Sequence, residues 1–113
     1  MNLMIIIQSD PLDSPRGVEA IRMALGLGTG SARLQILLLG NAPLLLTDQP
    51  DRIRDFETLE KYISAFEDSE SPFYIEERYL ADHPEFETVY PYQPLALDQI
   101  AQKISEADKF IVI

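Results

Sequence analysis

Short apolar runs that alternate with segments of helical spacing constrain the fold of this chain more than any other feature. The clearest run is Leu3–Ile7, in which every residue is apolar. A strand of this kind is buried on both faces, as in a parallel sheet that is covered by helices. Further strands are predicted at Arg33–Leu39, Phe73–Ile75 and Phe110–Ile113, and a short one at Phe86–Tyr90.

Apolar stripes at helical spacing separate these strands. The predicted helices are one that begins after Ser14 and Pro15 and ends at Gly26–Gly30, one from Pro50 to Phe66, a short one at Glu77–Asp82, and one with apolar residues from Leu97 to Ile104. Strands that alternate with helices form right-handed crossovers in a sheet covered on both faces. We therefore predict an α/β protein, a single domain over residues 1–113 built as a three-layer sandwich with a mainly parallel five-stranded sheet.

The acidic composition argues against several classes of partner. The 113 residues carry a formal net charge of −10 at pH 7. Binding to nucleic acid depends on clustered Lys and Arg, and anionic membrane surfaces also attract basic segments. We therefore expect no nucleic-acid partner and no membrane partner.

The chain contains no cysteine. Disulfides, thiolate nucleophiles and Cys-based metal sites are thereby excluded, and the composition fits a reducing compartment. The apolar N-terminus lacks a basic region and a cleavage site, so it is interpreted as a strand and not as a signal peptide. The apolar stretch Leu34–Leu46 is interrupted by Gly40, Asn41 and Pro43, and is too short to span a bilayer. We expect a soluble, cytoplasmic protein.

Candidate site residues follow the predicted strands, where α/β proteins usually bind ligands. Asp10, Asn41 and Glu76 each come just after a strand run, while Tyr90 and Tyr92 lie in a loop stiffened by Pro91 and Pro94. A strand-end carboxylate acts as an acid or base when burial raises its pKa, but a Glu that starts a helix also gains stability from the helix dipole. The two tyrosines suit a pocket wall or a subunit contact, and equally a loop packed on its own domain.

Other motifs do not carry a specific chemistry. The Gly26–Gly30 run follows a helix, whereas a phosphate-binding loop precedes one. Asp10 and Asp13 match the acidic pair of receiver domains, but Glu76 stands where those domains have their phosphoacceptor Asp. His83 has no partner at metal-ligand spacing, and no serine has the context of a nucleophile. We predict no metal, no cofactor and no catalytic residue, and an enzymatic role is the weaker interpretation.

Taken in order, the segments resemble the DsrE/DsrF-like family, small α/β proteins of sulfur metabolism that include the TusBCD relay subunits. The resemblance covers nearly the whole chain. It rests on Ser14–Gly17, the strand Ile36–Gly40, the segment Pro72–Glu76, and the ending Ile100–Ile113, which is similar to the family's helix followed by an "ADxxIxF" strand. These patterns are typical of the fold and not of a catalytic site.

The resemblance implies a function without the family's usual chemistry. In sulfur-carrying members, a strand of the "VYVC" type ends in the persulfide-accepting cysteine, and the corresponding residue here is Glu76. Members commonly form trimers or hexamers, for which the apolar segment Ala42–Leu46 and the loop Tyr90–Pro94 would provide contacts. Two hypotheses follow. The first is a non-catalytic homo-oligomeric subunit, accessory to sulfur transfer, with other relay subunits as candidate partners. The second is a ligand-binding protein or enzyme that uses an acidic crevice around Asp10, Asn41 and Glu76.

Overall fold

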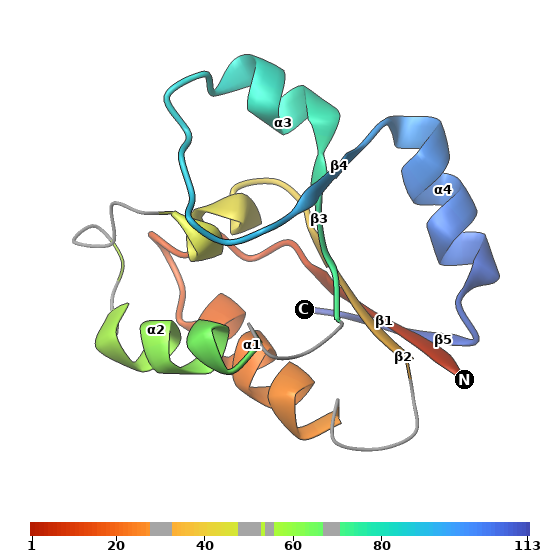
Figure 1. The fold of residues 1–113 in the computed structure, drawn as a ribbon, viewed down its shortest axis with the longest axis horizontal. Coiled ribbons are helices and arrows are strands. Elements are labelled where there is room, and N and C mark those ends of the chain that lie inside the picture. The colour runs from red at the N-terminus through yellow and green to blue at the C-terminus, as the bar shows by residue number, and fades with distance from the viewer. Residues whose placement is uncertain (28–32, 48–52, 54–55, 67–70) are drawn as a thin grey trace.

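A parallel five-stranded sheet forms the centre of the protein (Figure 1). The computed structural model describes residues 1–27, 33–47, 53, 56–66 and 71–113. In spatial order β4-β3-β2-β1-β5, the strands are β4 (Gln93–Leu95), β3 (Phe73–Glu76), β2 (Arg33–Leu38), β1 (Asn2–Ile7) and β5 (Lys109–Val112). Each neighbouring pair is parallel, which confirms the predicted α/β architecture.

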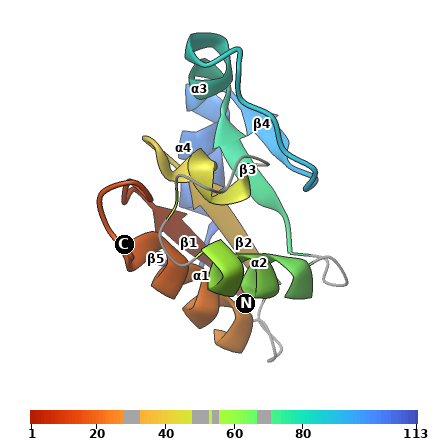
Figure 2. The same cartoon turned by 90° about the vertical axis from the view of Figure 1, so that its left-hand side faces the viewer.

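Helices lie on both faces of the sheet. The described helical elements are α1 (Arg16–Leu27), the 3₁₀ helix η1 (Ala42–Leu46), α2 (Phe56–Ala65), α3 (Glu77–Asp82) and α4 (Leu97–Glu106). Figure 2 shows α1 and α2 in front of the sheet and α4 behind it, while α3 extends beyond the carboxyl end of β3. The predicted three-layer arrangement is therefore present.

The interior strand β1, which lies between β2 and β5, contributes side chains to both hydrophobic cores. Ile5 and Ile7 are fully buried in the core beneath α1 and α2. Met4 and Ile6 point to the opposite face and are buried in the smaller core that includes Ile100 of α4. Alternate side chains of a strand point to opposite faces, so an uninterrupted apolar run serves two cores at once.

The prediction of a fourth strand at Phe86–Tyr90 is wrong. Residues 86–92 form no strand, and β4 lies further along, at Gln93–Leu95, where it pairs with Tyr74–Glu76 of β3. Phe86, the first residue of the predicted strand, lies in a loop, and its ring packs against that of Tyr79 with 5.7 Å between centroids. Because β4 is an edge strand and pairs on one side only, it accommodates Pro94.

Two helix boundaries differ from expectation. The second helix begins at Phe56 and not at Pro50, which lies outside the described residues, and Ile53 is buried without being helical. The first helix continues through Gly26 to Leu27, and Gly28 and Gly30 also lie outside the described residues.

The apolar segment Ala42–Leu46 is covered within a single chain. Ala42, Leu45 and Leu46 of η1 are buried in the core beneath α1 and α2, and only Leu44 is half-buried. A Cβ atom at Gly17 of α1 would lie 3.2 Å from both methyl carbons of Leu45, so the absence of a side chain there permits this close packing. The segment therefore needs no partner chain to cover it, and within Ala42–Leu46 only half-buried Leu44 remains for the expected subunit contact.

Candidate functional site

The carboxyl edge of the sheet brings Asp10 and Asn41 together across 31 residues of sequence. The Asn41 Nδ2 group donates a hydrogen bond of 2.9 Å to Asp10 Oδ2, and the backbone N–H of Leu12 donates one of 2.9 Å to Asp10 Oδ1. Gly40 has a φ of 58°, a left-handed conformation that glycine adopts without strain as the chain turns from β2 toward η1. This turn positions the Asn41 side chain beside the loop that follows β1.

Glu76 is the last residue of β3 and directly precedes α3. Its backbone is extended, with φ −61° and ψ 128°, and its side chain is half-buried and makes no hydrogen bond that caps the helix. Nor does it hydrogen-bond to Asp10 or Asn41, both of which the structure describes. Glu76 thus lies at the predicted strand end and takes no part in the hydrogen bond that joins Asp10 and Asn41.

Tyr79 is a residue that sequence reasoning missed. It is 8% exposed, and burial raises the pKa of its phenol, with further increases from the carboxylates of Glu85 and Asp10. Both carboxylates favour the neutral, protonated phenol. The only sequence signal was an apolar position in a short helix, which does not reveal that two acidic residues from other segments lie near it.

Aromatic rings extend from Tyr79 along the loop that leads to β4. The imidazole of His83 stacks on the Tyr79 ring at 4.1 Å between centroids, and Phe86 meets the same ring edge-on. Tyr92 is exposed, with its ring 6.3 Å from that of Phe86. His83 Nδ1 lies 3.0 Å from the backbone carbonyl oxygen of Tyr79, so the imidazole is held against α3.

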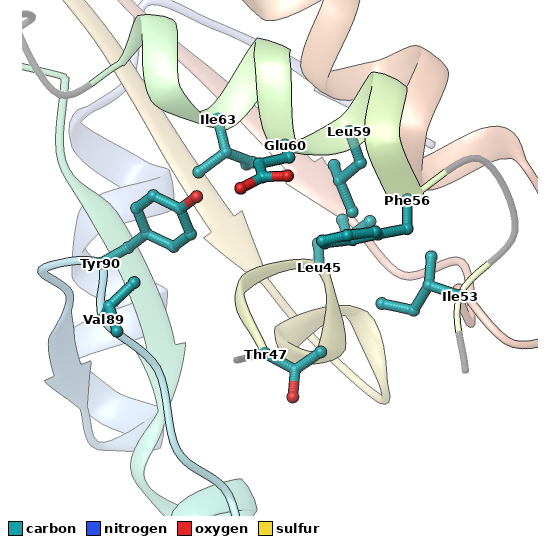
Figure 3. A pocket seen from close by; sticks show the side chains of 9 residues that line it. All are labelled: Leu45, Thr47, Ile53, Phe56, Leu59, Glu60, Ile63, Val89 and Tyr90. Carbon is teal, nitrogen blue, oxygen red and sulfur yellow. The ribbon is translucent and has the colours of Figure 1, made fainter. Parts of the chain in front are cut away.

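Tyr90 borders a cavity that none of the other candidates lines. It lines a cavity of about 190 Å³ between η1, α2 and the loop that precedes β4, as Figure 3 shows. The other lining residues are Leu45, Thr47, Ile53, Phe56, Leu59, Glu60, Ile63 and Val89. The loop thus packs on its own domain while leaving a space behind it.

Two searches of the described residues are negative. Within them, no three His, Asp or Glu side chains gather where they would hold a metal ion. No helix in this part of the chain is long and apolar enough to cross a membrane.

The comparisons with known proteins identify a fold. No protein-family model matches the sequence, and no curated protein matches it. Among solved structures, the YchN protein from E. coli superposes with a TM-score of 0.75 over 100% of both chains, at 16% sequence identity. The chain therefore has the same fold as YchN, a DsrE-like fold.

Proposed function

We propose that this protein is a cysteine-less member of the DsrE/F-like family, a non-catalytic subunit accessory to intracellular sulfur transfer in the cytoplasm. The proposal is supported by the DsrE-like fold together with the position of Glu76. Glu76 ends β3 at the carboxyl edge, the place where sulfur-carrying members have their cysteine. That position is the single observation on which the proposal rests.

The chemistry of Glu76 explains why the subunit would not carry sulfur itself. A persulfide is held by a sulfur–sulfur bond, which forms when a thiolate attacks an electrophilic sulfur. A carboxylate offers only oxygen, and the chain has no cysteine elsewhere. Its contribution to a relay would therefore be through assembly with other subunits and not through a covalent intermediate.

Exposed apolar residues on β5 support an assembly of identical chains. Phe110 and Val112 pair in register with Met4 and Ile6, so they share the face that α4 covers. They nevertheless remain 56% and 50% exposed, because they lie at the sheet edge. Exposed apolar side chains beside an open strand edge are typical of a subunit contact. We propose a homo-oligomer, a trimer or a hexamer, with this edge at its interface.

Substitution of Glu76 tests the proposed relation to the sulfur carriers. After incubation with a small persulfide donor, wild type should show no mass increase, whereas Glu76→Cys should gain the mass of one sulfur atom. Ile75→Cys, one residue earlier and fully buried, is the matched control and should remain unmodified in the folded protein. An inert thiol at position 76 in a folded variant would contradict the correspondence with the family's cysteine.

A second candidate function is a ligand site at the acidic carboxyl edge. The hydrogen bond between Asn41 and Asp10 favours it, and so do the carboxylates of Glu85 and Asp10, which add to the effect of burial in raising the pKa of Tyr79. In this alternative, Asp10, Asn41 and Glu76 would contact the ligand, with Tyr90 and Tyr92 as walls. A thermal-melting screen of polar metabolites distinguishes the two functions: a compound that stabilises wild type but not Asp10→Asn would favour the ligand site.

A further inference from the structure

The cavity behind Tyr90 goes beyond the proposed function, because neither Glu76 nor β5 contributes to it. Three separate elements form its walls. Phe56, Leu59 and Ile63 come from α2, Leu45 comes from η1, and Val89 and Tyr90 come from the loop before β4. Figure 3 shows these side chains directed toward a common space.

Two of the three walls belong to the core. Leu59 and Ile63 are buried in it, and Leu45 packs against the bare Cα of Gly17. On the third wall, half-buried Tyr90 packs against the same core, and its backbone N–H donates a local hydrogen bond of 3.1 Å to Thr88 Oγ1, while Val89 is exposed. The apolar floor of the space is therefore present before any ligand arrives, which lowers the cost of ordering it on binding.

The lining is apolar apart from a few groups. Glu60 lies one helical turn from Phe56 and Ile63, so it stands on the cavity side of α2 while remaining exposed. It forms no ion pair with another residue of the described chain. In Figure 3 the phenol of Tyr90 points toward the part of α2 that carries Glu60 and Ile63. An apolar chamber thus has a carboxylate and a phenol on one side.

The size of the cavity limits what can enter. A cavity of about 150 Å³ lined by Leu, Ile and Phe binds benzene in another protein. The present volume of about 190 Å³ accommodates one aromatic ring with a short side chain. The net charge of −10 attracts cations over anions, and the carboxylate of Glu60 adds a local negative charge at the cavity.

We propose that this cavity binds a small arylalkylamine, with its ring among Leu45, Leu59 and Ile63 and its protonated amine at Glu60. The ring replaces contact with water by contact with the apolar walls. The ammonium donates hydrogen bonds to the Glu60 carboxylate and to the Tyr90 hydroxyl oxygen. Because Glu60 and Tyr90 lie on the same side of the cavity, the short alkyl chain of the ligand can bring its ammonium to both.

A titration with 2-phenylethylamine at pH 7, followed by amide chemical shifts, tests the proposal. For a ligand of this size we expect a dissociation constant on the order of 0.1–1 mM. The shift changes should cluster at Leu45, Ile63 and Tyr90 and spare Asp10 and Asn41. The neutral analogue 2-phenylethanol should bind about tenfold more weakly, because it lacks the charge that Glu60 recognises.

Matched variants separate the specific contact from general attraction. Glu60→Gln should weaken binding of the amine about tenfold and leave binding of the alcohol unchanged. Glu57→Gln removes the same charge from an exposed position of α2 that does not line the cavity, and should bind like wild type. No saturable binding, equal binding of amine and alcohol, shifts centred on Asp10, or equal effects of the two variants would each overturn the proposal. None of these results depends on position 76, so the proposed function stands or falls separately.

Discussion

At the scale of single residues, the raised pKa of Tyr79 makes the stability of the fold depend on pH. Burial raises the pKa of its phenol, and Glu85 and Asp10 raise it further. The folded protein therefore retains the Tyr79 proton at a pH where the unfolded chain, with a pKa near 10.0, has lost it. The contribution of Tyr79 is fully present below pH 10 and is lost as the pH rises through the higher pKa of the folded state.

This difference predicts a pH-dependent stability. Above about pH 10, the free energy of unfolding of wild type should fall with increasing pH more steeply than that of Tyr79→Phe, because the phenylalanine has no proton to retain. Urea unfolding between pH 8 and 11 measures both slopes. Tyr92→Phe, which removes a hydroxyl from an exposed ring, is the control and should keep the wild-type slope. If the free energies of unfolding of wild type and Tyr79→Phe fell equally with pH, the raised pKa of Tyr79 in the folded protein would be contradicted.

At the scale of secondary-structure elements, α4 packs on the sheet through few buried side chains. It is the helix that covers the second face of the sheet, and among its residues only Ile100 is buried. The N-terminus of α4 is stabilised by Gln99 Oε1, which accepts a hydrogen bond of 2.8 Å from the backbone N–H of Ala96. Its attachment to the sheet therefore depends on one apolar side chain, with half-buried Ile104 and Ala107 beside it.

We expect substitutions in α4 to separate sharply by burial. Ile100→Ala should lower the free energy of unfolding by about 2–5 kcal/mol, the range for large-to-small changes in a core. Leu97→Ala, at a position of the same helix that is 72% exposed, should change it by less than about 0.5 kcal/mol. Chemical denaturation of the two variants measures both values. Similar losses in the two variants would mean that Leu97 is covered in the assembled protein.

At the scale of the whole molecule, the open β5 edge carries the prediction of assembly. Light scattering at micromolar concentration should give wild type a mass of three or six times the 12.8 kDa of one chain. The double substitution Phe110→Asp and Val112→Asp should shift it toward the single-chain mass, because it places charges on the proposed contact. Glu57→Asp together with Glu60→Asp, which conserves charge on exposed positions of α2, is the control. A wild-type mass of 12.8 kDa across the concentration range would exclude a stable oligomer.

Much of this fold was predictable because its signals are local. The apolar run Leu3–Ile7 has to be buried on both faces, wherever the rest of the chain lies. The rule that parallel strands end at one edge also placed Asp10 near Asn41 before any contact was known. The strand at Phe86–Tyr90 was mispredicted because residue type shows only which segments can extend, whereas pairing depends on which segment reaches the edge of β3.

The sequence by itself determined the α/β class, the buried strand β1 and the absence of a thiol at the end of β3, since each depends on residue type and local spacing. Only the tertiary structure decided that η1 is covered within the chain, that the carboxylates of Glu85 and Asp10 raise the pKa of the buried Tyr79, and that η1, α2 and the Tyr90 loop border a cavity. These features arise from how separate surfaces fit together. The same apolar stripe on α2 would suit a filled core or a hollow one, and the difference is decided by what packs against it.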